Sequence, residues 1–287
     1  LLDRAERLLL DLVDESQTMR TTAQHYLLEI YQSERDWKSA VEVASQLLPR
    51  KPLLGGAPAE AFDDRGQSVK VALAHYYCEM AAQKIERGKL QQAHKLLEQS
   101  LSTDKACVRA SIMMGDVEYQ SGHYKSAIKA LHRVRSQDPG YISETVTILR
   151  QCARALGDVH SLKTYLQECL ASHPSGALAL AIADDIRDSE GDVAAGKFLS
   201  TALAEQPSLR GLSRLIGLQM DHTEGPAREN LGLLQVLVNR LVADRHAYRC
   251  SHCGFAGRQL HWFCLGCKCW GTMKIINNKG GEEWNHP

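Results

Sequence analysis

The chain has 287 residues, a length that suits either two ordinary domains or one elongated repeat array with an appendage. Its 34 basic residues equal its 34 acidic residues, so no overall charge would attract the chain to nucleic acid or to a membrane surface. Aromatic residues make up only 6 % of the chain while Leu and Ala are frequent, a composition that favours helices over a β-sandwich or barrel.

The chain contains no signal peptide and no apolar run of about eighteen residues that could cross a bilayer. It starts at Leu1 inside an amphipathic pattern, so we expect a fragment that has lost N-terminal residues, including any membrane anchor. Its nine cysteines are an odd number, and four of them stand alone on helical patterns. This usage indicates a reducing compartment rather than a disulfide framework.

The first elements are read as helix pairs of a repeat. Ala5 and Leu9 fit the second helix of a unit whose first helix is missing. In the next unit, residues 31–52, Tyr31, Trp37 and Ala40 occupy the Tyr, aromatic and Ala positions of the tetratricopeptide (TPR) pattern. We therefore expect residues 1–243 to form an N-terminally truncated array of helix pairs that resembles the TPR family.

An inserted loop is expected at residues 49–67, PRKPLLGGAPAEAFDDRGQ. Its Pro and Gly content disfavours a helix. A loop of that length within a compact array is either functional or mobile, and the sequence alone favours mobility.

Four glycines mark a repeat along the middle of the chain. Gly88, Gly122, Gly157 and Gly191 are 34, 35 and 34 residues apart, a period typical of a helical solenoid. In the best copy, residues 110–139, small residues at positions 115 and 127 would let two antiparallel helices approach closely. We therefore predict that each marked glycine ends the first helix of a pair.

Later copies depart from this design. Arg150 with Leu162, and then Gly196 with Ser200, replace the residues expected at the helix contacts, which predicts looser packing or altered angles. A last helix pair, residues 209–220 and 229–244 joined by a turn at residues 225–226, is expected to cap the array.

The strongest chemical signal is a pair of Cys-x-x-Cys motifs ten residues apart, formed by Cys250, Cys253, Cys264 and Cys267. Each motif can present two thiolates to one ion, so together they predict a tetrahedral metal site in residues 244–287. Gly254 permits the positive φ that such a knuckle needs, whereas Lys268 fits the second knuckle less comfortably. Cys269 and His261 are rival ligands, and a redox dithiol or free thiols are the alternatives.

This site would be filled by four protein ligands and closed to substrate, which makes it structural. Sulfur ligands suit one iron or one zinc ion equally well. Neighbouring aromatic side chains are expected to form an apolar shell around the small module: Tyr248, Phe255, Trp262, Phe263 and Trp270. The slight excess of basic residues in this module is weak support for nucleic-acid binding, and we expect none.

No catalytic or cofactor-binding residues are predicted, because GxSxG, HExxH, GxGxxG and P-loop motifs are absent from the sequence. The side chains of His75, Tyr76 and Tyr77 are read as packing or groove-lining residues on a helix. The four isolated cysteines, Cys78, Cys107, Cys152 and Cys169, are read as small buried residues. Stacked helix pairs expose a concave surface that suits a peptide or another protein, so the chain is expected to be an adaptor rather than an enzyme.

The order of three segments sharpens this prediction: AHYYCEMA, then VRASIMMGDV, then YRCSHCGF followed by HWFCLGCKCW. A TPR array with a rubredoxin-like, zinc-ribbon type module at its C-terminus resembles the lipopolysaccharide assembly protein B (LapB) family of Gram-negative bacteria. The likeness implies an all-α TPR solenoid with a four-cysteine module at residues 244–287. It also implies that the four motif cysteines are the metal ligands.

The resemblance further implies a place and a role. Members of that family are held at the inner membrane by one N-terminal helix, with the repeats and the module on the cytoplasmic side. They help the membrane protease FtsH to degrade the deacetylase of the lipid A pathway. The alternative is a scaffold that gathers lipopolysaccharide assembly proteins at the inner membrane without controlling proteolysis.

Overall fold

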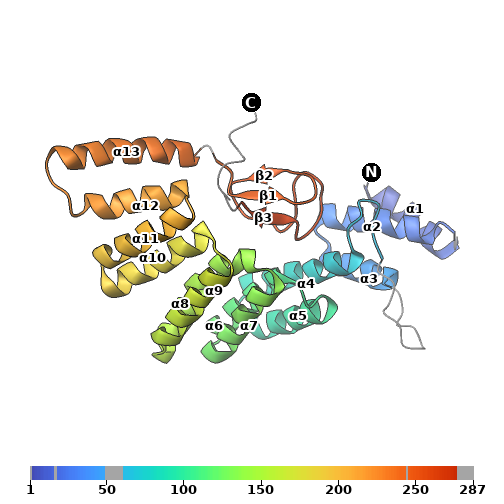
Figure 1. The fold of residues 1–287 in the computed structure, drawn as a ribbon. Coiled ribbons are helices and arrows are strands. Elements are labelled where there is room, and N and C mark those ends of the chain that lie inside the picture. The colour runs from blue at the N-terminus through green and yellow to red at the C-terminus, as the bar shows by residue number, and fades with distance from the viewer. Residues whose placement is uncertain (1, 16–17, 49–60, 244, 277–287) are drawn as a thin grey trace. The chain divides into compact units, whose positions relative to one another are not determined.

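The computed structural model describes residues 2–15, 18–48, 61–243 and 245–276. Helices dominate this part of the chain (Figure 1). The α-helices are α1 (Leu2–Glu15), α2 (Arg20–Glu34), α3 (Trp37–Leu47), α4 (Val69–Glu86), α5 (Leu90–Thr103), α6 (Val108–Gln120), α7 (Tyr124–Gln137), α8 (Ile142–Leu156), α9 (Val159–Ser172), α10 (Gly176–Glu190), α11 (Asp192–Glu205), α12 (Leu209–Met220) and α13 (Pro226–Ala243). A 3-10 turn, η1 (Pro139–Tyr141), precedes α8.

Three short strands follow the helices: β1 (Tyr248–Cys250), β2 (Ala256–Gly257) and β3 (Met273–Ile275). They form one sheet in the order β2-β1-β3. Strands β1 and β2 are antiparallel, with Tyr248 opposite Gly257. The sheet and the segments between its strands form a small ribbon, as expected for the four-cysteine module.

The chain divides into two compact units. The first contains Leu1–Arg133, Ser251–Phe255 and His261–Met273, and the second contains Val134–Cys250, Ala256–Leu260 and Lys274–Pro287. Each unit therefore combines helix pairs with pieces of the ribbon. The domain boundary expected between residues 243 and 244 remains a prediction.

Glycines end the first helices of the repeats, as the sequence predicts. Gly157 is the C-cap of α8, with φ 70° and its N–H bonded to Ala153 O and Arg154 O. Gly122 separates α6 from α7 with φ 79°. The second helix that follows Gly157 starts with an acidic cap, because Asp158 accepts a hydrogen bond from Ser161 N. The glycine period therefore predicts helix ends because a left-handed residue is needed there.

The best repeat copy packs as closely as expected. A Cβ at Gly115 would lie 2.4 Å from Leu131 Cδ2, so only glycine fits against this side chain. Ala127 is fully buried on the same second helix. In the next copy, Arg150 reaches from α8 to α10, where its Nε lies 2.9 Å from Asp185 Oδ1. An ion pair thus accompanies the change from a small to a long side chain.

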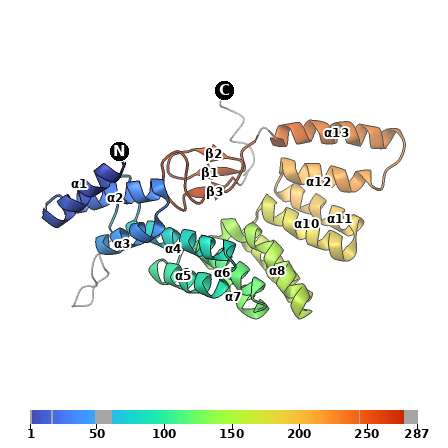
Figure 2. The same ribbon diagram turned by 180° about the vertical axis from the view of Figure 1, so that it is seen from behind.

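The last pair, α12 and α13, forms as two helices joined through Gly225 and Pro226 (Figures 1 and 2). On α13 only Val238 is buried. Its apolar side chains are largely exposed, namely Leu233, Leu234, Val236, Leu237 and Leu241. The outer surface of the expected cap is therefore not the polar face typical of a terminal repeat.

The loop predicted at residues 49–67 is described only from residue 61 onward, and residues 49–60 lie outside the described part. Residues 61–67 are not helical, as expected. Asp63 accepts hydrogen bonds from the backbone N–H groups of Arg65 and Gln67, and Phe62 pairs with Ser68 in an isolated bridge. None of the helices in the described part of the chain combines the length and the apolar composition of a membrane-spanning helix.

Candidate metal centre and its support

The two Cys-x-x-Cys segments form turns whose backbone matches metal-binding knuckles. Gly254 has φ 77° in the first, and Lys268 has φ 61° at the equivalent position of the second. Lys268 thus adopts the left-handed conformation, which a lysine adopts less readily than the glycine of the first turn. Its N–H donates to Cys264 O at 3.0 Å, and its ammonium lies 5.8 Å from the centre of the Phe263 ring.

These turns bring all four predicted cysteines together. One sulfur from each of Cys250, Cys253, Cys264 and Cys267 lies within 4.8 Å of the others. The sulfurs of Cys253 and Cys264 are 3.6 Å apart. A tetrahedron with Zn–S bonds of about 2.3 Å has edges of about 3.8 Å, so this spacing fits one ion.

Burial and packing support the same arrangement. Cys250 and Cys264 are buried, whereas Cys253 is exposed. A Cβ at Gly266 would lie 3.0 Å from Cys253 Sγ and 3.1 Å from Phe255 Cβ, so the two knuckles meet where no side chain fits. Four sulfur donors would complete the coordination of one iron or zinc ion and leave no position for substrate.

The two rival ligands, Cys269 and His261, differ in their distance from other possible metal ligands. Cys269 is buried, and its Sγ lies within 4.8 Å of ligand atoms of Cys267 and His252. His261 belongs to neither group of metal-ligating side chains found among the described residues. His252 was missed in the sequence because its position between two cysteines resembles that of any turn residue.

The second knuckle docks on helices of the first unit through Trp270. This side chain is 3 % exposed and packs in one apolar cluster with residues of α2, α3 and α4. Its ring centre lies 5.9 Å from that of Trp37 and 6.0 Å from that of Tyr76, both edge-on. Trp270 was expected to form part of the module's own shell, but it belongs to the core of the repeats as well.

Polar contacts fix Trp270 in this position. The side-chain amide of Gln67 donates to Trp270 O and accepts from Trp270 N, both at 2.9 Å. The indole Nε1 of Trp270 donates to Gln32 Oε1 at 3.0 Å. Gln67 is itself buried, and its side-chain amide satisfies the N–H and C=O of Trp270 as the backbone of a neighbouring strand would. The end of the predicted loop is therefore structural support for the ribbon.

His75 also contacts the indole of Trp270. The two rings are stacked with centres 5.2 Å apart. Burial, followed by the positive charge of Arg109, lowers the pKa of His75 to about 3, so the imidazole is neutral near pH 7. Arg109 pairs with Glu79 at 2.8 Å, and its guanidinium carbon lies 6.0 Å from the centre of the Trp270 ring.

The other residues that the sequence singled out are packing residues. Tyr76 is buried in the Trp270 cluster, and Tyr77 is partly buried against it. The four isolated cysteines are all buried, as expected: Cys78, Cys107, Cys152 and Cys169. Cys78 and Cys107 pack in a cluster of buried residues from α4, α5, α6 and α7, which matches the interpretation as small core residues.

The fold and the site define a class: an α-helical repeat protein with a C-terminal four-cysteine ribbon. The sequence profile of the tetratricopeptide repeat family matches residues 84–151. Lipopolysaccharide assembly protein B of Escherichia coli (strain K12) is 34 % identical over 282 residues, which cover 98 % of this chain and 69 % of that protein. The protein of the same name from Haemophilus influenzae (strain ATCC 51907 / DSM 11121 / KW20 / Rd) is 31 % identical over 278 residues, 96 % of this chain and 66 % of its own.

The chain therefore belongs to the lipopolysaccharide assembly protein B family. Among solved structures, that of PilF from Pseudomonas aeruginosa is similar at a TM-score of 0.41 and 15 % identity, covering 85 % of this chain and 95 % of its own. This likeness is too distant to bear on function.

Proposed function

We propose that the chain is a non-enzymatic adaptor that regulates lipopolysaccharide synthesis. Membership of the lipopolysaccharide assembly protein B family supports the pathway, and the helical repeats support a binding role. The observation that carries the adaptor function is the docking of Trp270 into the core of the first unit. Trp270 follows the second Cys-x-x-Cys turn closely, so its burial among α2, α3 and α4 ties this turn to the repeats.

In this proposal the adaptor works on the cytoplasmic side of the inner membrane and promotes proteolysis of the lipid A pathway deacetylase by FtsH. Metal bound by the four cysteines would hold the ribbon in the shape that Trp270 and Gln67 require. The ion, iron or zinc, would then have a structural role, because four protein ligands leave no open coordination position.

The test is the half-life of the deacetylase in cells that lack the gene, complemented either with the wild-type protein or with its Cys264→Ser/Cys267→Ser variant. We expect the deletion to lengthen the half-life, the wild type to restore it and the variant to fail. An unchanged half-life in the deletion strain would overturn the role in proteolysis. It would favour the alternative, a scaffold that gathers lipopolysaccharide assembly proteins.

The metal is identified by elemental analysis and visible absorption of protein purified without added metal. One equivalent of iron with thiolate charge-transfer bands would assign iron, and one equivalent of zinc without such bands would assign zinc. Folded protein that contains no metal would overturn the metal centre itself.

A further inference from the structure

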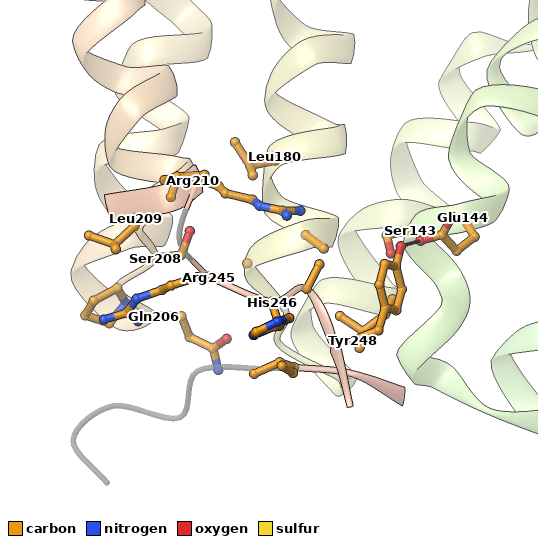
Figure 3. A pocket seen from close by; sticks show the side chains of 17 residues that line it. Ser143, Glu144, Leu180, Gln206, Ser208, Leu209, Arg210, Arg245, His246 and Tyr248 are labelled. Atoms are coloured by element: carbon orange, nitrogen blue, oxygen red, sulfur yellow. Dashed lines mark hydrogen bonds between the residues drawn. The ribbon is translucent and has the colours of Figure 1, made fainter. Parts of the chain in front are cut away.

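A pocket of about 290 Å³ lies within the second unit, and none of the four motif cysteines is part of its lining (Figure 3). Residues from the amino-terminal ends of α8, α10 and α12 line it on one side. The segment before β1 and the end of β3 line it on the other. The pocket therefore gathers the starts of three first helices and part of the ribbon.

Its lining carries a positive charge. Arg210 and Arg245 are cationic, and Glu144 is the single acidic residue of the described lining. Glu144 is already engaged, since its Oε1 accepts a hydrogen bond from Tyr248 Oη at 3.0 Å. Counted over these three side chains, two positive charges and one negative charge leave a formal charge of +1.

Arg210 is the cation best placed for a ligand. In Figure 3 its guanidinium extends from the start of α12 towards α10, near Leu180. Among the described residues no hydrogen bond or ion pair engages this guanidinium, and the side chain is exposed. A guanidinium that projects into a pocket in this way can bind a carboxylate through two parallel hydrogen bonds.

The backbone adds donors to the same space. Gly176 and Ala177 begin α10 and line the pocket, and the side chain of the N-cap residue, Ser175, does not cap this helix. First-turn N–H groups have no carbonyl partner within their own helix and carry the positive end of its dipole. The hydroxyl of Ser143, another lining residue, is buried and has no hydrogen-bond partner among the described residues.

Apolar side chains complete the pocket beside these polar groups. They come from α10, from the start of α12, from the end of β3 and from the residue after it, and include Leu180, Leu209, Ile275 and Ile276. A ligand that uses the whole lining carries a negative group next to an aliphatic one. A single carboxylate balances the formal charge of +1. A phosphate monoester carries a charge of about −1.5 to −2, which exceeds the charge of the lining, and Glu144 would repel the excess.

We propose that this pocket binds an acidic side chain, flanked by an aliphatic residue, in an extended segment of a partner protein. The inference rests on the proposed adaptor function, since it names the chemistry of one segment that the adaptor holds. Arg210 and the first turn of α10 bind the carboxylate, and the apolar wall contacts the neighbouring aliphatic side chain.

The experiment is an NMR titration of the ¹⁵N-labelled, metal-loaded protein with acetyl-Gly-Leu-Glu-Leu-Gly-amide. We expect shifts of the amide signals of Gly176, Ala177 and Arg210. Binding should weaken at least about tenfold for the matching Gln peptide, which keeps the shape but loses the charge. Added salt should also weaken it, because the contact is an exposed charge pair.

Arg210→Glu should weaken binding of the Glu peptide at least about tenfold, and Arg210→Lys should weaken it less. Arg228→Glu is the matched control, because Arg228 is an exposed arginine at the start of α13 outside the pocket lining. Equal binding of the Glu and Gln peptides, or equal effects of the two Glu variants, would overturn the proposal. If acetate alone gave the same shifts at the same affinity, the pocket would be a simple anion site and not a peptide site.

Failure of this inference is distinct from failure of the proposed function. The titration measures binding by the purified protein and does not depend on which process the adaptor controls. An absent peptide interaction with a normal effect on the deacetylase half-life would remove the pocket and leave the adaptor. Peptide binding with an unchanged half-life in the deletion strain would leave the pocket as a binding site and remove the role in proteolysis.

Discussion

Trp270 and Leu237 are both large apolar side chains late in the chain, yet the first is 3 % exposed and the second is 46 % exposed. Trp270 enters a site where helices α2, α3 and α4 supply aromatic contacts and Gln67 pairs with its backbone. Helix α13, which carries Leu237, buries only Val238. Trp270 thus has both ring contacts and polar partners, whereas Leu237 is exposed on a helix that buries a single residue.

The largest effect is expected from removal of the metal ligands. In Cys264→Ser/Cys267→Ser the ribbon should lose its metal and its fold, since structural zinc contributes about 10–16 kcal/mol in isolated zinc-finger peptides. Trp270 would then become exposed in the same way as Leu237. Elemental analysis and a red shift of tryptophan fluorescence measure both consequences.

Cys269→Ala is the control for this experiment, because Cys269 is a buried cysteine of the same segment outside the four-sulfur group. This variant should keep one equivalent of metal. If it lost the metal while the double variant kept it, the ligand set would be wrong.

Trp270→Ala tests the docking site directly. Truncation of a buried Trp typically costs about 3–5 kcal/mol, and here it also removes the hydrogen bond to Gln32. Leu237→Ala should change the free energy of unfolding by less than about 0.5 kcal/mol, since its side chain is exposed. Urea unfolding followed by circular dichroism measures the difference, and equal effects would contradict the comparison.

Gln67→Leu separates the polar contacts from the apolar ones. The variant keeps the volume but leaves the N–H and C=O of Trp270 without partners, at an expected cost of about 2–3 kcal/mol. Gln151→Leu, at an exposed position of α8, should be nearly neutral. The same unfolding measurement applies, and a neutral Gln67→Leu would mean that ring packing alone holds the knuckle.

The expectations that the sequence supported depend on local chemistry. The glycine spacing located the helix ends because Gly157 and its counterparts need a positive φ. The cysteine spacing located the knuckles because two thiolates from one turn can share an ion. Both signals lie within a few residues of the feature that they predict.

The contact between Gln67 and Trp270 joins residues 203 positions apart, so no local pattern indicated it. Gln67 stood at the end of a segment with Pro and Gly, where the sequence favoured a mobile loop. The pocket near Arg210 was missed for the same reason, since its lining comes from α8, α10, α12 and the ribbon. Such sites depend on how distant elements meet.

The His75 pair with Trp270 gives the docking site a pH dependence. The pKa of His75 is about 3 in the folded protein and 6.5 in the reference state, so acid protonates the unfolded chain first. Stability is therefore lost as the pH falls below about 6.5. Between pH 7 and pH 5 the wild type should lose about 2 kcal/mol more than His75→Leu.

This difference is measured by urea unfolding of both proteins at the two pH values. Carboxylates and the metal centre titrate in both proteins, so their contributions cancel in the comparison. Equal losses would mean that His75 is accessible to protons in the folded state, and the docking site would then be less closed than its burial indicates.

The smallest effect is expected on α13, where Leu234→Gln and Leu237→Gln replace exposed side chains. Each should change the free energy of unfolding by less than about 0.5 kcal/mol, because little apolar area leaves an interior. Val238→Gln is the matched control one position away, and it should cost more than about 1 kcal/mol because Val238 is the buried residue of the helix. If all three variants were equally destabilising, α13 would be covered in solution and would no longer contrast with the Trp270 site. If only Val238→Gln were destabilising, the exposed leucines would belong to a free surface. The two regions would then differ because Trp270 has packing and hydrogen-bond partners, whereas these leucines of α13 are exposed.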